Sequence, residues 1–151
     1  MELEVLGIDH IFLAVSDLAR SQAWYDAVMK VLGFRKVERA IGGAPHIHYF
    51  NQSLRLSIRP ASELRAHDQN APGLHHLCFQ VRDRPSVDEA AHRLRAVGIA
   101  TSAPRSYPEY APDYYAIFLR DPDGIELEIV NRFQARVDVL KNWNSYRSIG
   151  E

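Results

Sequence analysis

Two stretches of the chain alternate between apolar and polar residues in the same order. HIFLAVSD at residues 10–17 returns as HLCFQVRD at residues 76–83, with His, Val and Asp at matching places. An alternation with a period of two indicates a strand, because successive side chains point to opposite faces. In each copy the opening histidine lies opposite the main apolar positions. His10 and His76 are therefore predicted on equivalent faces of two equivalent strands.

Each of these strands is followed by the pattern of an amphipathic helix. Asp17 and Asp83 are good N-cap residues, and Gly33 and Gly98 supply the left-handed stop at the other end. The apolar residues between them recur at i, i+3, i+4 and i+7: Tyr25, Val28, Met29 and Leu32, then Val87, Ala90, Ala91 and Leu94. The matching order indicates that one unit was duplicated.

Further strand patterns follow each helix, separated by turn residues. They cover residues 46–50 and 54–58 in the first half, and residues 114–119 and 125–130, around the turn DPDG at 121–124, in the second. Aligning the last strands pairs Ser57 with Glu128 and places about five extra residues of the second half in the loop 104–112. Residues 68–73 are the predicted linker. In the tail, Val137, Leu140 and Trp143 predict a short helix that docks on the body or contacts another subunit.

Composition narrows the class of protein. The 151 residues suit one domain, and 46% hydrophobic with 25% charged residues is typical of a soluble globular chain. A net charge of −1 argues against nucleic acid as a partner, and no apolar run reaches the roughly 20 residues of a membrane span. The lone Cys78 is expected to be a small buried residue. With an acidic start unlike a signal peptide, the chain is expected to be cytoplasmic.

The candidate chemistry lies on the face that carries the two histidines. Ile125, Leu127 and Ile129 form the helix-facing side of the last strand, which leaves Glu126 and Glu128 on the other face. Two imidazoles and one carboxylate suit a catalytic divalent ion with open positions for water or substrate. The structural alternative is that each histidine is a half-buried polar residue bonded to backbone. His75 is expected to support its neighbour or the fold rather than to bind metal.

The repeated halves, the histidine that opens each of them and the segment FLRDPDGIELE at residues 118–128 resemble the vicinal oxygen chelate superfamily. This superfamily includes glyoxalase I, extradiol dioxygenases and the fosfomycin and bleomycin resistance proteins. The resemblance covers residues 7–131 and implies an α+β fold of two tandem βαβββ modules, with a cup-shaped mixed β-sheet and helices packed outside. It predicts a single domain over residues 1–151, with module one at about 7–67, module two at about 74–131 and a tail at 132–151. It also implies His10, His76 and Glu128 as metal ligands, and a homodimer.

Ser57 departs from the family pattern. In this superfamily glyoxalase I and methylmalonyl-CoA epimerase place a ligating carboxylate or amide at the matching position, and a serine is too short and too weak a base for that role. Three protein ligands remain, as in iron(II) oxygenases and manganese-dependent fosfomycin enzymes. Fe²⁺ or Mn²⁺ is therefore favoured as the cofactor, with Zn²⁺ or Ni²⁺ as alternatives.

Other polar residues are candidates for handling a substrate. His46 and His48 share a strand face and could act as acid or base, although exposed strand histidines are the commoner explanation. Arg55 and Arg59 lie on the face of Ser57, where they could receive a carboxylate or phosphate or remain solvated. The tyrosines beside the extra loop suggest an aromatic lid: Tyr107, Tyr110, Tyr114 and Tyr115. Of these, Tyr110 is assigned to substrate binding with Arg55 and Ser57, and Tyr115 to catalysis with His46 and His48.

The leading hypothesis is a metal-dependent enzyme whose ion chelates a small oxygenated substrate, dioxygenase-like or fosfomycin-resistance-like. Two alternatives stay open. One is a lyase or isomerase of glyoxalase I type, which would need a base other than residue 57. The other is a non-catalytic drug-binding protein of bleomycin-resistance type, which would have little use for His10, His76 and Glu128 together.

Overall fold

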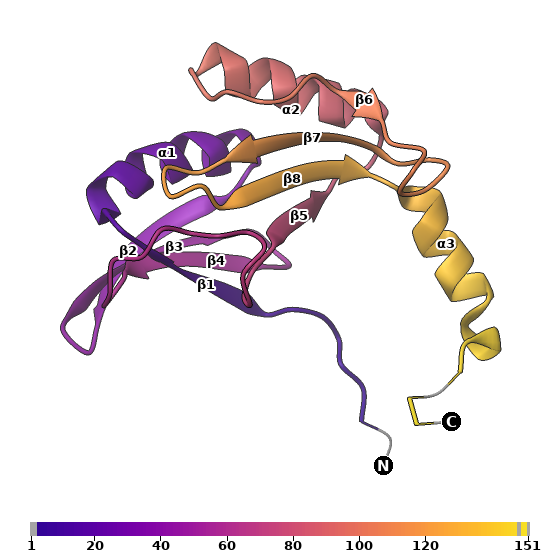
Figure 1. The fold of residues 1–151 in the computed structure, drawn as a ribbon, viewed down its shortest axis with the longest axis horizontal. Helices are drawn as coiled ribbons and strands as arrows, with labels where there is room; N and C mark the ends of the chain where they lie inside the picture. Colours follow the sequence, from indigo (N-terminus) through magenta and orange to yellow (C-terminus); the bar gives the residue numbers. More distant parts are fainter. Residues whose placement is uncertain (1–2, 148, 151) are drawn as a thin grey trace.

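The computed structural model describes residues 3–147 and 149–150, and it consists of two modules built in the same order (Figure 1). The elements of the first module are β1 His10–Val15, α1 Leu18–Val31, β2 Arg35–Ile41, β3 Ala44–Phe50 and β4 Arg55–Pro60. Those of the second are β5 His76–Gln80, α2 Arg84–Ala96, β6 Arg105–Ser106, β7 Tyr115–Arg120 and β8 Glu126–Asn131. Helix α3 Phe133–Lys141 and the short 3₁₀ turn Trp143–Ser145 follow. The predicted tandem βαβββ fold of the α+β class is confirmed.

Each module forms its own four-stranded mixed sheet. The strand orders are β1-β4-β3-β2 and β5-β8-β7-β6, with a parallel pair β1·β4 or β5·β8 in each. In the first sheet Phe12 pairs with Ser57, and in the second Cys78 pairs with Glu128. Ser57 and Glu128 therefore occupy equivalent places, as the alignment of the two halves predicted.

The helices begin and end where the sequence indicates. The Asp17 side chain accepts a hydrogen bond from the Arg20 amide at 3.0 Å, and Asp83 accepts one from the Ser86 amide at 2.9 Å. Gly33 and Gly98 follow the helices at φ values of 79° and 82°, a region that suits glycine.

The modules differ most at the strand after the helix. The seven-residue β2 is a full edge strand, whereas its counterpart β6 has two residues and continues into the loop before β7. The extra residues of the second half thus replace most of a strand by a loop.

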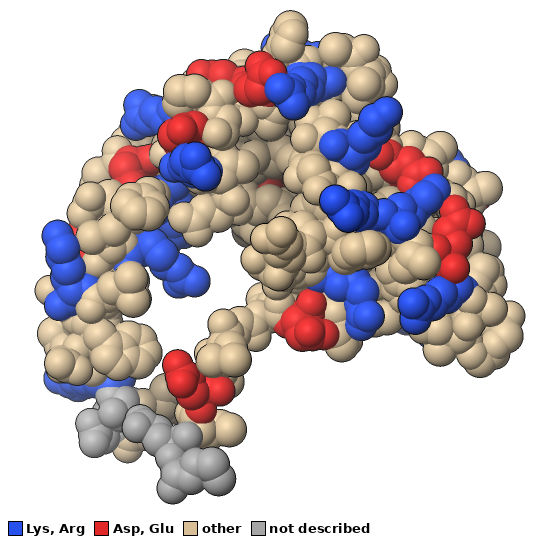
Figure 2. Space-filling view, turned by 180° about the vertical axis from the view of Figure 1, so that it is seen from behind, with Lys and Arg blue, Asp and Glu red and all other residues tan. Residues whose placement is uncertain are grey.

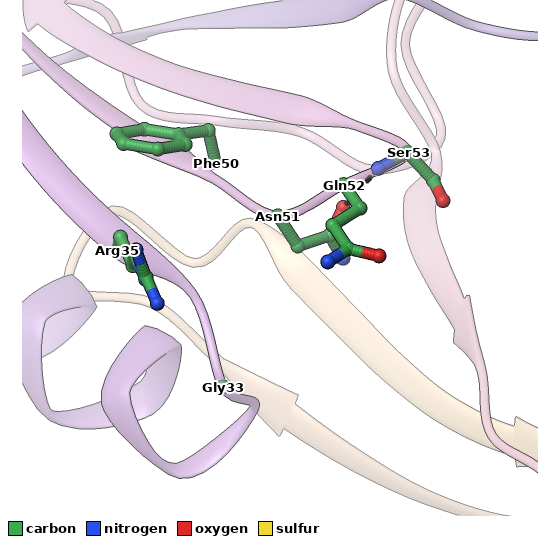
Figure 3. Close-up of a pocket in the computed structure, with 6 residues that line it drawn as sticks. All are labelled: Gly33, Arg35, Phe50, Asn51, Gln52 and Ser53. Atoms are coloured by element: carbon green, nitrogen blue, oxygen red, sulfur yellow. Dashed lines mark hydrogen bonds between the residues drawn. The ribbon is translucent and has the colours of Figure 1, made fainter.

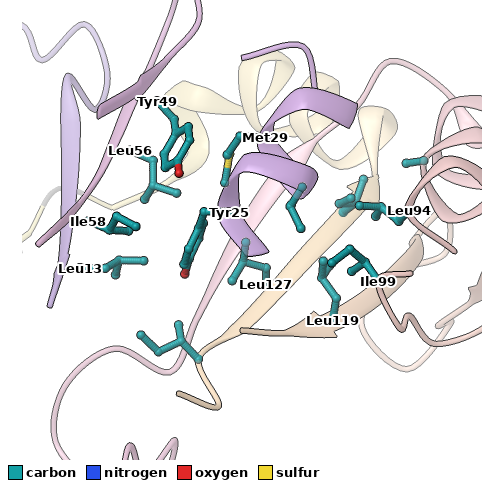
Figure 4. Packing of buried hydrophobic residues seen from close by; sticks show 14 of the residues in the cluster. Leu13, Tyr25, Met29, Tyr49, Leu56, Ile58, Leu94, Ile99, Leu119 and Leu127 are labelled. Atoms are coloured by element: carbon teal, nitrogen blue, oxygen red, sulfur yellow. The ribbon is translucent and has the colours of Figure 1, made fainter. Parts of the chain in front are cut away.

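One hydrophobic core joins both modules. It contains residues of α1 and α2 together with the inner faces of both sheets. Figure 4 shows Tyr25 and Met29 of α1 between Leu56 and Ile58 of the first sheet and Leu127 of the second. The helices thus cover one face of each sheet and leave the other face open.

The DPDG turn ties the second module to the first. The buried Asp121 carboxylate accepts hydrogen bonds from the Tyr25 hydroxyl at 2.9 Å and from the amide of Ile125 at 2.8 Å. Asp123 accepts a bond from the Ser16 amide at 2.8 Å and pairs with Arg20 at 3.1 Å. The motif therefore anchors α1 against the turn between β7 and β8.

Both ends of the chain expose apolar side chains. The N-terminal arm, residues 3–9, carries Leu3 and Leu6 at 90% and 92% exposure, and α3 contains no buried residue. Figures 1 and 2 show an open space bordered by the second sheet, the arm and α3. The predicted apolar stripe of the tail is present but does not dock within the described part of one chain. None of the described helices is long and apolar enough to cross a membrane.

Candidate metal and substrate site

Glu128 and His76 meet on the open face of the second sheet. β8 and β5 are parallel neighbours, and Glu128 of β8 pairs with the residue two positions after His76. The His76 Nε2 and Glu128 Oε2 atoms are 3.3 Å apart, and the Glu128 side chain is 1% exposed. A buried carboxylate and a half-buried imidazole thus converge on one point, as two ligands of one ion would.

Tyr114 holds the other oxygen of Glu128. Its hydroxyl donates a short hydrogen bond to Glu128 Oε1, which leaves Oε2 directed at His76. Burial, together with this carboxylate, raises the pKa of Tyr114, so the hydroxyl keeps its proton at neutral pH. The hydroxyl is therefore a lasting donor that fixes the carboxylate.

Cys78 lies opposite Glu128 across the β5–β8 pair. The residue is exposed on the open face, so the expectation of a buried Cys78 is wrong. The reason is the strand alternation, which places Cys78 on the same face as His76. Local desolvation and the neighbouring Glu128 carboxylate raise the pKa of the thiol, which disfavours the thiolate that a nucleophile requires.

The second nitrogen of His76 contacts His75. The two Nδ1 atoms are 2.7 Å apart, and the Gln69 side-chain amide lies 3.2 Å from His75 Nδ1. With the His76 proton on Nδ1 and donated to His75, the lone pair of His76 Nε2 is free to bind a metal. Gln69 also contacts Glu126, which Arg120 binds at 2.9 Å. Glu126 is thus held at the rim by Arg120 and Gln69.

His10 lies on the open face of the first sheet. Its Nδ1 atom is 2.7 Å from the Asp9 carboxylate. Within residues 3–147 and 149–150, no three His, Cys, Asp or Glu side chains come close enough to form a cation site. The structure brings two of the three predicted ligands together and leaves His10 apart from them.

His46, His48 and Ser57 gather on that same face of the first sheet. His48 Nδ1 lies 2.7 Å from the Ser57 hydroxyl, and the His46 and His48 rings stack at 6.0 Å. All three side chains are buried, so the explanation of His46 and His48 as exposed strand residues is wrong. Neighbouring Phe12 packs edge-on against both rings.

The protonation of these histidines follows from their surroundings. His46 Nδ1 must donate to the Ala44 carbonyl oxygen at 2.8 Å, so in the neutral imidazole Nε2 is the acceptor. Burial, followed by the positive charge of Arg55, by neighbouring His46 and by the positive charge of Arg39, lowers the pKa of His48. His48 is therefore neutral near pH 7 and able to take up a proton.

The tyrosines divide between the two faces of the second sheet. Tyr115 lies on the helix side, where its hydroxyl bonds Asp88 of α2 at 2.8 Å, so the structure does not bring this predicted catalytic residue to the site. Its alternation with Ile117 and Leu119 could have shown this. Tyr114, one position earlier, contacts Glu128 instead. Tyr110 is exposed and packs against Tyr107 and Tyr114 beside the open face.

A surface hollow lies away from both of these faces. It measures about 580 Å³ and is lined by Gly33, Arg35, Phe50, Asn51, Gln52 and Ser53 (Figure 3). Asn51 Oδ1 accepts hydrogen bonds from the amides of Ser53 and Leu54, so this side-chain oxygen already stabilises the turn. The chemistry lies on the two open sheet faces rather than in this hollow.

Comparison with known proteins gives one family match. Residues 7–129 match the family model described as Glyoxalase/Bleomycin resistance protein/Dioxygenase superfamily. The Bacillus subtilis (strain 168) protein YqjT is 30% identical over 125 residues, which covers 80% of this chain and 95% of YqjT.

Solved structures share the fold. The glyoxylase/bleomycin resistance protein/dioxygenase domain from Frankia sp. EAN1pec superposes with a TM-score of 0.69 at 25% identity, covering 85% of this chain and 98% of that domain. A mutant of the fosfomycin resistance protein FosX from Listeria monocytogenes, complexed with Mn(II) and 1S,2S-dihydroxypropylphosphonic acid, has a TM-score of 0.65 at 19% identity. The superposition covers 89% of this chain and 99% of the FosX chain.

Proposed function

The chain belongs to the glyoxalase/bleomycin resistance protein/dioxygenase superfamily, and we propose that within it the protein is a metal-dependent enzyme whose divalent ion chelates a small oxygenated substrate. The observation that carries this proposal is the convergence of His76 Nε2 and the buried Glu128 Oε2, 3.3 Å apart. Enzymes and non-catalytic binding proteins share this superfamily, so the proposal depends on the donor set.

The donor set fits a divalent cation. A buried carboxylate is costly unless a positive group balances it. In the described part of the chain the ionic contact of Glu128 is with His76. A neutral imidazole does not balance the negative charge of this carboxylate. A cation bound by Oε2 and Nε2 would balance the charge, while Tyr114 keeps Oε1 occupied.

We propose that His10 of a second copy supplies the third ligand. β1 and β5 are equivalent strands, so His10 and His76 lie on equivalent open faces. The helices pack in the common core between the two modules, so neither open face is covered by its own module's helix. A twofold dimer in which the first sheet of one copy faces the second sheet of the other would bring His10 to His76 and Glu128, and would do so twice.

When bound, such an ion would supply Lewis acidity and hold the substrate oxygens in place. The residues of this chain perform the remaining steps. Glu128 provides the negative charge, and His75 contacts His76 Nδ1, which directs His76 Nε2 toward the ion. His46 Nε2 and neutral His48 are the candidate proton acceptors on the facing wall. Arg55, Ser57 and Tyr110 remain the candidate substrate contacts.

The reaction of this enzyme is either dioxygenase-like or fosfomycin-resistance-like. A lyase of glyoxalase I type is the less favoured alternative, because the position equivalent to Glu128 holds Ser57, which is buried and bonded to His48. A metal-free drug-binding protein is the other alternative, and the metal content separates it from the enzymes.

The test is the metal content of the purified protein and of matched variants. Elemental analysis of protein prepared without chelators, followed by Mn²⁺ and Fe²⁺ titration, should show one ion per chain. His76→Ala and Glu128→Gln should each lower the affinity by more than about 100-fold, because a ligand matters more than its supporting residues. Glu126→Gln is the control, since Arg120 and Gln69 hold this carboxylate at the rim. Undiminished binding in both ligand variants would overturn the proposal.

A further inference from the structure

The strand register shows which side chains share the open face of the first sheet. Phe12, Ser57 and His48 are paired across β1, β4 and β3, so every second residue from them lies on the same side. Four arginines belong to this set: Arg35 and Arg39 of β2, and Arg55 and Arg59 of β4. The histidines of the set are His10, His46 and His48. Within these four strands no Asp or Glu shares the face, and we call it the cationic wall.

One acidic residue lies at the rim of this wall. Asp9 precedes β1, bonds His10 and is exposed. Its pKa is lowered by the hydrogen bond from His10 and by the charge of Arg55, so it stays ionised. The other acid of the sheet, Glu38, lies on the opposite face and pairs with Lys36. The wall therefore keeps an excess of positive charge that the described residues do not balance.

Arg55 carries a guanidinium donor without an acceptor on this wall. Its Nε atom is shielded from solvent and has no hydrogen-bond acceptor among the described residues. A shielded guanidinium donor without an acceptor is unfavourable, and an oxyanion is the acceptor that its planar fork fits best. Arg55 pairs in register with both His10 and Phe50, which places this donor beside the predicted third metal ligand.

The open face of the second sheet differs in that it carries carboxylates. Glu126 and Glu128 lie there beside His76, with Arg120 bound to Glu126 and Arg105 of β6 on the same face. The protein thus presents one face with carboxylates suited to a cation and one face whose charged strand residues are all cationic and suited to an anion. The net charge of −1 argues against a nucleic acid on the cationic wall.

We propose that the cationic wall binds the anionic group of the substrate, a carboxylate or a phosphoryl or phosphonyl group, through Arg55 and Arg39 above His46 and His48. This inference rests on the proposed function, because it assigns the substrate class of that enzyme. The substrate would then be a small molecule that carries metal-chelating oxygens at one end and a negative group at the other.

The experiment separates anion binding from metal binding. The chelator-treated protein is titrated at constant ionic strength with inorganic phosphate, methylphosphonate and propionate, while the ¹⁵N shifts of His46 and His48 are followed by NMR. We expect saturable shifts with a Kd on the order of millimolar, either for phosphate and methylphosphonate or for propionate. The anion that binds more tightly identifies the negative group of the substrate as phosphoryl or phosphonyl, or as a carboxylate. Arg55→Gln should weaken binding by about tenfold. Arg93→Gln on the outer face of α2, where Arg93 pairs with Glu89, is the matched control.

Two outcomes would overturn the inference. One is the absence of saturable shifts with all three anions, and the other is an equal loss of affinity in Arg55→Gln and Arg93→Gln. Mn²⁺ titration of Arg55→Gln keeps the two proposals apart, because this variant should retain its metal stoichiometry. Loss of anion binding with retained metal binding contradicts only the cationic wall, whereas retained anion binding in a protein that binds no metal contradicts only the proposed metal enzyme.

Discussion

Tyr114 determines which oxygen of Glu128 is available to a cation. The tyrosine hydroxyl occupies Oε1, so the lone pairs of Oε2 face His76 Nε2. A buried carboxylate that is free to rotate would present either oxygen and would lose entropy on binding an ion. Tyr114 is thus a positioning residue, since it acts through Glu128.

Tyr114→Phe should lower the metal affinity by about 10- to 100-fold without changing the stoichiometry. The ring keeps its packing against Tyr107 and Tyr110, so a fall in affinity reports the lost hydroxyl. Titration with Mn²⁺ measures the effect, and Tyr110→Phe, at an exposed neighbour of the same cluster, is the control. Equal affinities of wild-type protein and Tyr114→Phe would show that Glu128 is oriented by the sheet alone.

His48 should make the stability depend on pH. Its pKa is lowered in the folded protein, mainly by burial and further by Arg55 of β4, His46 of β3 and Arg39 of β2. The unfolded chain takes up a proton near the ordinary pKa of about 6.5, and the folded chain does not. The free energy of unfolding should therefore fall as the pH drops below about 6.5. Urea unfolding between pH 7.5 and pH 5.5 should show a shallower fall in His48→Gln, with His92→Gln as the control for loss of an imidazole. A steeper or unchanged fall in His48→Gln would contradict this prediction.

For single residues, the sequence predicts which strand face a side chain lies on better than it predicts which other side chains it contacts. Strand alternation was enough to place Glu128 with His76, and it also argues for Tyr114 over Tyr115. It does not indicate that His48 bonds Ser57, or that Gln69 of the linker reaches His75, because these contacts depend on the path of loops and on side-chain packing. The burial of His46 and His48 depends on packing with residues of other strands, such as their contacts with Phe12, which the pattern of their own strand does not include.

Among the elements, the DPDG turn has a role beyond reversing the chain. Asp121 accepts hydrogen bonds from a hydroxyl of α1 and from two amides of its own turn; two of these bonds are buried and the one from the Asp123 amide is partly buried. Burial raises the pKa of Asp121, while these donors oppose the rise. The turn and α1 therefore stabilise each other across the module boundary.

Asp121→Ala should lower the free energy of unfolding by roughly 2–4 kcal/mol, because it leaves the Tyr25 hydroxyl and two amides without an acceptor. Tyr25→Phe should cost about 1–2 kcal/mol. Since the two groups share one hydrogen bond, the double variant should cost less than the sum of both, which urea unfolding measures. Tyr49→Phe, which removes the bond to half-buried Asp26, is the control. Strict additivity of the two changes would contradict the link.

The elements that the sequence predicts are those with a buried face. Residues 10–15, 46–50 and 125–130 alternate clearly, since one side packs against a helix. The edge strand β2 carries charged residues on both faces, so its sequence RKVERAI shows no such alternation. The shrinkage of β6 to two residues likewise has no local signal, because it reflects the loop that replaces the strand.

At the scale of the whole molecule, the open faces of the two sheets do not meet at one metal site within the described residues of a single chain. One core unites the modules, and the described residues of one chain form no complete cation site. The arm and α3 border the same open space (Figure 1), and both expose apolar side chains that burial against another copy would remove from water. The sequence could not show this arrangement, because the packing of one module on the other depends on contacts between distant residues. The proposed dimer would cover the exposed apolar ends and complete the proposed ligand set.

A shared site makes a specific prediction for mixed variants. His10→Ala and His76→Ala should each lose metal binding when pure. When the two proteins are mixed, unfolded and refolded together, the mixed dimers would contain one site with His10 from one copy and His76 with Glu128 from the other. Random pairing makes half of the dimers mixed, each with one intact site of two, so the mixture should recover about one quarter of the wild-type metal content. Mixing His76→Ala with Glu128→Gln is the matched control, because both changes affect the same half of the site and no pairing restores it. If His10→Ala with His76→Ala recovers no more metal than this control, the third ligand does not come from a second copy, and a site within one chain would have to form by movement of the modules.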